Sequence, residues 1–274
     1  MKSTNISLIC SDIDGTLLNI DRELSPLTKK VIHRLDKSIP FILISSRMPV
    51  SMRQLQKELN CLEAPLIAYN GSLVVDQATP LLSREIDVAV IEEIVTAVKS
   101  TNIHVSLYYF DQWYVPANDY WAQREAHNTR VQPKIQPLLN TLNEFKQRKV
   151  GAHKVMCMGP KEEIEGLERL LTTHFQTAVN AYRSKDTYIE VNHKAQDKFS
   201  ALRFLMKIKY PSLKLENTLA FGDNYNDKTL LEQVGHGVAV ANAKEEIISI
   251  AQAVTSSNID DGVARYIQGV FPTN

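Results

Sequence analysis

Three short apolar runs in the first 70 residues each end in a cluster of polar residues. The runs are residues 6–10, 41–44 and 66–69, and amphipathic stretches separate them. Continuous apolar strands that alternate with helices are typical of a parallel sheet covered on both faces. Because parallel strands end at the same edge, we expect the polar clusters to meet there. The pattern therefore predicts an α/β protein with a Rossmann-like, doubly wound parallel sheet.

The cluster after the first run contains two carboxylates, in the sequence Asp12-Ile13-Asp14-Gly15-Thr16. In an extended chain, residues two apart share a face, so both carboxylates project from one edge. The glycine allows a tight turn whose backbone amides can face an anion. One carboxylate of such a pair can attack an electrophile while the other moves protons, and a divalent cation can hold both reactants. The alternative is an acidic turn with no chemical role.

A second acidic cluster follows the apolar strand predicted at 218–221, in the sequence Gly222-Asp223-Asn224-Tyr225-Asn226-Asp227. Asp223 and Asp227 offer oxygen ligands to a hard cation such as Mg²⁺, which takes few protein carboxylates and keeps water or phosphate oxygens. A polar turn with Asx capping is the alternative. Two acidic strand ends in one predicted sheet favour a metal and phosphate site.

Two further residues fit an anion site by their order along the chain. Ser45 follows the second apolar run and offers a hydroxyl and neighbouring backbone amides to a phosphate. Lys198 begins the helix predicted at 198–209 and offers a compact positive charge. Taken separately, the serine fits a helix cap and the lysine a solvated side chain. Their positions relative to the two acidic clusters indicate phosphate binding.

The middle of the chain changes character and carries most of the aromatic residues. Strand-like and helical patterns alternate there, at residues 88–99, 105–110, 154–158, 161–175 and 188–191. This alternation predicts an inserted α/β module with a small sheet of its own. We therefore expect a core domain formed by residues 1–80 and 188–274 and an inserted domain formed by residues 81–187.

Composition excludes several classes of protein. Lys plus Arg and Asp plus Glu both total 31 in 274 residues, so no net charge recruits nucleic acid or an anionic membrane. No stretch approaches the roughly 18 consecutive apolar residues of a transmembrane helix, and we expect no signal peptide. Cys10, Cys61 and Cys157 are far apart and form no CxxC pattern. They predict reduced thiols in a cytoplasmic protein.

Together, the four clusters resemble the motifs of the haloacid dehalogenase-like phosphatase superfamily. The chain is most similar to the Cof-type members, in which a large α/β (type IIB) cap is inserted after the third strand. Supporting segments are Asn70-Gly71, residues 237–243 and residues 258–264. Two motifs depart from the subfamily pattern. The second motif commonly reads Thr-Gly-Arg and here reads Ser45-Ser46-Arg47, and the lysine is commonly followed by glycine and here by Phe199.

The resemblance implies a Mg²⁺-dependent phosphatase that acts on a small phosphorylated metabolite, with a sugar phosphate as the first candidate. Asp12 would attack phosphorus to form an aspartyl-phosphate, and Asp14 would protonate the leaving group and then activate water. Mg²⁺ would bind Asp12, the backbone carbonyl of Asp14 and Asp223. Ser45 and Lys198 would bind the phosphate oxygens.

Other residues receive supporting roles. Asn226 and Asp227 would orient Lys198 and the metal ligands. The insertion would set substrate specificity. Candidates for contact with substrate or cap are Arg47, Asn70, Arg183 and Lys185.

Two other functional classes remain open at this stage. A phosphotransferase such as a phosphomutase uses the same aspartyl-phosphate but excludes water. A non-catalytic binding protein could keep the fold, although the intact Asp12, Asp14 and Asp223 favour an enzyme. The expected assembly is a monomer or a small homo-oligomer.

Overall fold

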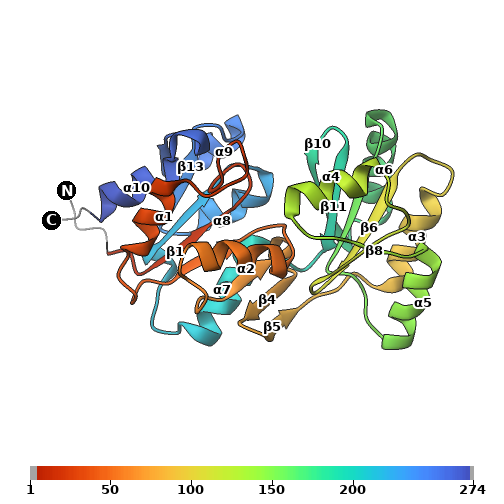
Figure 1. Cartoon of the computed structure of the whole chain (residues 1–274), viewed down its shortest axis with the longest axis horizontal. Coiled ribbons are helices and arrows are strands. Elements are labelled where there is room, and N and C mark those ends of the chain that lie inside the picture. Colours follow the sequence, from red (N-terminus) through yellow and green to blue (C-terminus); the bar gives the residue numbers. More distant parts are fainter. Residues whose placement is uncertain (1–4, 272–274) are drawn as a thin grey trace. The chain divides into compact units, whose positions relative to one another are not determined.

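The computed structural model describes residues 5–271, which divide into two compact units with a sheet each (Figure 1). The first unit contains the chain up to Ser46, residues Met52–Leu81 and the chain from Asp197 onward. The second unit contains Arg47–Ser51 and Leu82–Gln196. The chain thus contains the insertion that the sequence predicts.

An eight-stranded sheet forms the centre of the first unit, in the order β14-β13-β12-β1-β2-β3-β4-β5. Its parallel strands are β1 (Leu8–Ser11), β2 (Phe41–Ile44), β3 (Leu66–Ala68), β12 (Thr218–Gly222), β13 (His236–Val240) and β14 (Ala253–Thr255). Strand β4 (Leu73–Asp76) pairs with β3 in the antiparallel sense, and β5 (Thr79–Ser83) follows at the edge. Figure 1 shows the red N-terminal β1 beside blue strands from the C-terminal part, in agreement with its pairing with β12.

The winding of this sheet creates a switch point beside β1. From β1 the chain moves outward to β2 and β3, and after the insertion it returns to β12 and moves outward to β13 and β14. Ligands in such sheets bind beyond the carboxyl ends of the strands at the switch point. Asp12 and Asp223 follow the two strands that flank it, and the predicted doubly wound α/β core is confirmed.

Six helices of the described chain belong wholly or mostly to the first unit. They are α1 (Pro26–His33), α2 (Pro49–Glu58), α7 (Lys198–Lys209), α8 (Lys228–Gln233), α9 (Glu245–Ile250) and α10 (Gly262–Val270). Short 3₁₀ turns are η1 (Tyr69–Gly71), η2 (Leu215–Asn217), η3 (Tyr225–Asp227) and η4 (Asn258–Asp260). In α7 the Asp197 carboxylate accepts the Ser200 N–H at 2.7 Å, while Ser200 Oγ accepts the Asp197 N–H at 3.0 Å. This capping box fixes Lys198 as the first helical residue.

The second unit has a six-stranded sheet in the order β10-β11-β9-β6-β7-β8. Its strands are β6 (His104–Tyr109), β7 (Gln112–Val115), β8 (Lys134–Ile135), β9 (Lys154–Met158), β10 (Val179–Lys185) and β11 (Tyr188–His193). Its helices are α3 (Val88–Ala97), α4 (Tyr120–Thr129), α5 (Leu138–Arg148) and α6 (Lys161–His174). Apolar side chains of α3, α5 and α6 join those of the sheet in one buried core.

The boundary at residue 188 needs correction. Strand β11 pairs with β10 and β9 of the second sheet, so residues 188–193 belong to the insertion. The chain returns to the first unit at Asp197, directly before α7. Pairing with β9, some 30 residues earlier in the chain, decides this boundary, and no turn or composition signal at 188 reveals it.

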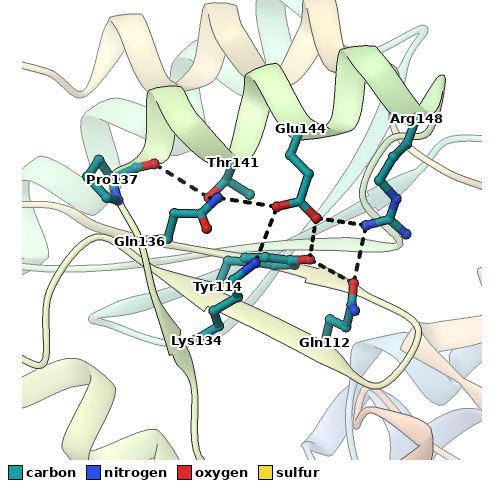
Figure 2. Close-up of polar contacts among 8 residues, drawn as sticks. All are labelled: Gln112, Tyr114, Lys134, Gln136, Pro137, Thr141, Glu144 and Arg148. Carbon is teal, nitrogen blue, oxygen red and sulfur yellow. Dashed lines mark hydrogen bonds and ion pairs between the residues drawn. The ribbon is translucent and has the colours of Figure 1, made fainter.

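A polar network around Glu144 of α5 attaches the short edge strand β8 to the second unit (Figure 2). Glu144 Oε1 accepts hydrogen bonds from the Tyr114 hydroxyl at 3.2 Å and from Arg148 at 3.0 Å. Its Oε2 accepts from Lys134 at 3.3 Å and Gln136 at 3.4 Å. The carboxylate therefore connects α5 with β7 and with the segment that contains β8.

His153 is buried in the second unit and is neutral there. The Phe110 backbone N–H donates to its Nδ1 at 3.3 Å, so the ring proton lies on Nε2 and is donated to Ser83 Oγ at 2.9 Å. Ser83 in turn donates to the Glu85 carboxylate at 3.0 Å. Burial lowers the pKa of His153 to about 3.

We expect this histidine to destabilise the second unit in acid. Its folded pKa of about 3 lies below the unfolded value of about 6.5, so between these values the unfolded chain binds a proton that the folded chain does not. Stability therefore rises with pH in this window, and the loss between pH 7.5 and pH 5 is about 2 kcal/mol. His153→Gln should remove this loss in urea unfolding at the two pH values. The exposed His174→Gln should leave it unchanged, and an equal acid loss in wild type and His153→Gln would contradict the assignment.

Two sequence expectations bear on the chain as a whole. In the described residues, no helix has the length and apolarity needed to cross a membrane. The three cysteines are free thiols; Cys10 and Cys157 are buried, and Cys61 is partly buried. Burial raises the pKa of Cys10 to about 12, so this thiol next to the acidic cluster is protonated.

Candidate active site

Asp12 lies at the carboxyl end of β1 and is only 6% exposed. Its backbone N–H donates to the Phe221 carbonyl at 3.0 Å, which continues the ladder between β1 and β12. The first residues of the two acidic clusters are therefore held side by side by backbone pairing. The sequence predicts this meeting at the sheet edge.

Lys198 is fully buried between two carboxylates. Its ammonium nitrogen lies 2.8 Å from Asp12 Oδ1 and 2.6 Å from Asp227 Oδ1. Burial alone would lower the pKa of Lys198, but the charges of Asp12 and Asp227 outweigh it and raise this pKa above its usual value. The lysine therefore remains a cation in the interior, next to the carboxylate expected to act as nucleophile.

Asp227 organises the second acidic loop. Its Oδ2 accepts the backbone N–H groups of Asp223 and Asn224, each at 3.1 Å. A Cβ at position 222 would lie 2.5 Å from the Asp227 Cβ, so only glycine allows this approach. Both Asp227 oxygens are thus engaged, one by Lys198 and one by the loop.

Three carboxylates lie close together in this cluster and favour the binding of a cation. Carboxylate oxygens of Asp12, Asp223 and Asp227 lie within 4.8 Å of one another and face the ammonium of Lys198. Burial raises the pKa of Asp12, and burial together with the charge of Asp227 raises the pKa of Asp223 to about 7. A divalent ion at Asp12 and Asp223 would relieve this repulsion, and hard carboxylate oxygens fit Mg²⁺. Thr16 fixes Asp223 by donating to its Oδ1 at 2.7 Å.

Asp14 differs from this buried cluster in its surroundings. Its carboxylate pairs with Arg22 at 3.2 Å, and both side chains are 39% exposed. A carboxylate within reach of solvent suits proton exchange better than metal binding by its side chain. Arg22 is a site residue that sequence reasoning missed, because it belongs to no motif and lies in an ordinary polar loop.

The other residues predicted from the sequence are divided between the two units. Ser45 is buried at the end of β2, and the buried Asn70 accepts a hydrogen bond from Asn226 at 2.9 Å, so these residues meet within the first unit. Arg47 is buried too, but it belongs to the short segment that is part of the second unit.

The two insertion candidates have neighbours within the second unit. Arg183 forms ion pairs with Glu168 at 2.9 Å and Glu165 at 3.4 Å, both on α6. Lys185 Nζ lies 5.2 Å from the centroid of the Tyr188 ring. The guanidinium of Arg183 is therefore engaged by α6, which makes it a weaker candidate for substrate contact than the sequence suggests.

Two asparagines from the C-terminal segments hold the loop that follows β1. Asn242 donates to the Gly15 carbonyl at 2.8 Å, and Asn258 donates to the Leu18 carbonyl at 2.7 Å. The Asn258 backbone N–H also donates to Asn242 Oδ1 at 2.8 Å. The sequence marks both segments only by resemblance, and the structure shows that they support the loop carrying Asp14.

The known proteins that this chain resembles match it over nearly its whole length, including all the candidate site residues. The sequence profile of a family described as haloacid dehalogenase-like hydrolases matches residues 9–267. A relative from Haemophilus influenzae is 34% identical over 269 residues, covering 96% of this chain and 98% of the relative. The 5-amino-6-(5-phospho-D-ribitylamino)uracil phosphatase YcsE of Bacillus subtilis is 27% identical and covers 97% of this chain and 96% of its own. A crystal structure from Thermotoga maritima has a TM-score of 0.83 at 29% identity, covering 96% of this chain and 97% of that one.

Proposed function

Because the chain belongs to the haloacid dehalogenase-like hydrolase family and is a Cof-type phosphatase, we propose that it hydrolyses its substrate through an aspartyl-phosphate on Asp12. The observation that supports this most strongly is the position of Asp12. Its carboxylate follows β1 at the switch point, lies 2.8 Å from a buried ammonium and is within 4.8 Å of two further carboxylates. A buried carboxylate in such surroundings is held in place for attack.

The first chemical step joins Asp12 to phosphorus. An oxygen of Asp12 attacks the phosphoryl group, the bond to the leaving oxygen breaks, and Asp14 gives its proton to that oxygen. In this proposal Lys198 balances the negative charge of the transferring oxygens, and the Ser45 hydroxyl donates a hydrogen bond to one of them. Mg²⁺ held by Asp12, the Asp14 carbonyl and Asp223 would reduce the repulsion between carboxylate and phosphate dianion.

The second step releases phosphate and restores the enzyme. Water loses a proton to the Asp14 carboxylate and attacks phosphorus, and the bond between phosphorus and the Asp12 oxygen breaks. Asp14 can exchange this proton because its side chain is partly exposed and is held by Arg22. Asp14 thus acts first as an acid and then as a base.

The proposed substrates are small phosphorylated metabolites, with sugar phosphates and related polyol phosphates first. In support, the name of the Bacillus subtilis relative YcsE describes a phosphate on a ribityl chain. We propose the second unit as the specificity cap, with Arg47 and Lys185 as candidate substrate contacts. Arg183 has lower priority because of its ion pairs with α6.

A metal-dependent screen tests this proposal. The pure protein with Mg²⁺ should release phosphate from at least one sugar or polyol phosphate in a panel of phosphorylated metabolites. Chelation with EDTA should abolish this activity and Mg²⁺ should restore it. Ca²⁺ should inhibit, because it prefers longer bonds and more oxygen ligands and would draw both Asp12 oxygens into coordination.

Two results would contradict the proposal. Full activity after exhaustive chelation would exclude the metal-assisted mechanism. Phosphate that appears on an added sugar, with no free phosphate in its absence, would identify a phosphotransferase.

A further inference from the structure

The turn after β3 has an unusual backbone. Tyr69 and Asn70 both have φ of 54°, and Gly71 has φ of 100°, so the residues of η1 all lie in the left-handed region. This conformation costs a residue with a side chain about 1–2 kcal/mol. It persists where the surroundings fix it, and such residues cluster at functional sites. All three residues of η1 are buried.

The backbone of η1 contacts two of the predicted phosphate-binding elements. The Asn70 N–H donates to the Ser45 carbonyl at 2.9 Å, and the Ser45 N–H donates to the Ile67 carbonyl at 2.9 Å. A Cβ on Gly71 would lie 2.3 Å from the carbonyl oxygen of Asp197, the residue before Lys198. The turn therefore packs between the end of β2 and the start of α7.

The Asn70 side chain contacts a third element. It is 1% exposed, and its Oδ1 accepts a hydrogen bond from Asn226 Nδ2 at 2.9 Å. The other end of the same amide, Asn226 Oδ1, is buried and has no hydrogen-bond partner in the part of the chain that the structure describes. The Asn70 oxygen accepts, and the Asn226 amide can donate only through its nitrogen, so Asn70 determines which end of the Asn226 amide faces away from it.

We propose that Asn70 is a positioning residue of the phosphate site and acts through Asn226. Its contacts hold the Asn226 amide, and Asn226 directly precedes Asp227, which binds Lys198 at 2.6 Å. Its backbone holds Ser45 at the same time. This role rests on the proposed function and replaces the expectation that Asn70 contacts substrate or cap. Ser45 and Lys198 are proposed to bind the phosphoryl group and not the leaving group. The loss of activity on changing Asn70 should therefore be the same for every leaving group.

Asn70→Gly removes the amide and leaves the backbone free to keep its left-handed conformation and its bond to Ser45. Asn60→Gly is the matched control, because Asn60 is exposed and has φ of 53°. We expect Asn70→Gly to lower kcat by about 10- to 100-fold. The factor should be the same for a small aryl phosphate and for the best metabolite. Asn60→Gly should keep full activity, although it should shift Tm by about as much as Asn70→Gly does.

A double-mutant cycle separates positioning from a structural role. If Asn70 acts through Asn226, Asn70→Gly should cause no further loss in an Asn226→Ala background. Losses that multiply in the double variant would overturn the proposal, as would equal activity of the Asn70→Gly and Asn60→Gly proteins.

Binding of inorganic phosphate provides a readout that does not depend on turnover. In the presence of Mg²⁺, calorimetry should show weaker phosphate binding by Asn70→Gly than by wild type or Asn60→Gly. If the wild type binds phosphate but hydrolyses nothing, the proposed function fails while this comparison still decides the role of Asn70. Unchanged phosphate affinity in Asn70→Gly would contradict that role.

Discussion

Asp12→Asn should reduce phosphate release by at least about 10⁴-fold and leave the protein folded. An amide is a poor nucleophile and a weak ligand for Mg²⁺, so both proposed roles of Asp12 are lost. Without metal, the melting temperature should stay the same or rise, because Asp12 shares a buried cluster with Asp223 and Asp227. Removing one carboxylate from this cluster relieves repulsion, and Lys198 keeps its contact with Asp227.

The matched control for this variant is Asp36→Asn. Asp36 is exposed and accepts the Ser38 N–H at 2.8 Å, a bond that asparagine also makes. This control should keep full activity. A folded Asp12→Asn protein with activity near that of the control would exclude Asp12 as the nucleophile.

Lys198→Met should reduce both activity and stability. It leaves Asp12 and Asp227 buried without their ammonium partner, which should lower the free energy of unfolding by about 3–5 kcal/mol. Activity should fall by about 10²- to 10³-fold or more, because the charge that faces the phosphoryl oxygens is gone. Urea unfolding and phosphate release measure the two effects separately.

Lys209→Met serves as the control in the same helix. Lys209 pairs with Asp76 at a partly exposed site, and such pairs contribute no more than about 1 kcal/mol. Adding Asp227→Asn to Lys198→Met should recover part of the stability and none of the activity. If Lys198→Met and Lys209→Met lower the free energy of unfolding equally, the buried ammonium does not stabilise the fold by compensating the charges of Asp12 and Asp227.

The sequence predicted elements whose bounds depend on neighbouring residues, such as a short apolar strand or a capped helix. The apolar run 41–44 forms β2 with the expected bounds, and the helix expected at 198–209 is α7, because Asp197 and Ser200 supply a capping box. Strands β4 and β8 and the assignment of β11 to the second sheet were not foreseen. The assignment of β11 depends on pairing with β9, some 30 residues earlier in the chain, which a short apolar pattern does not encode. Strand β4 pairs with its neighbour β3 across the left-handed turn η1, and β8 is only two residues long.

In the candidate site, too, residues with a local sequence signal were predicted and contacts between distant residues were not. Two strand ends with a strong local signature pointed to Asp12 and Asp223, and the order of motifs along the chain added Lys198. The parallel sheet and the start of α7 bring the three side chains together. The bond between Asn70 and Asn226 joins residues 156 positions apart, and neither side chain carries a local signal of it. Likewise, the ion pairs of Arg183 depend on how α6 packs on the second sheet.

Trapping the covalent intermediate shows directly whether Asp12 is the nucleophile. The wild-type protein with Mg²⁺ and its best substrate should be quenched in acid within the first turnover, digested and examined by mass spectrometry. The peptide containing Asp12 should gain the mass of one phosphoryl group and lose this label in alkali, and the same peptide of the Asp12→Asn protein should gain none. A phosphoryl group on another residue, or rapid turnover with no labelled peptide, would contradict this role of Asp12.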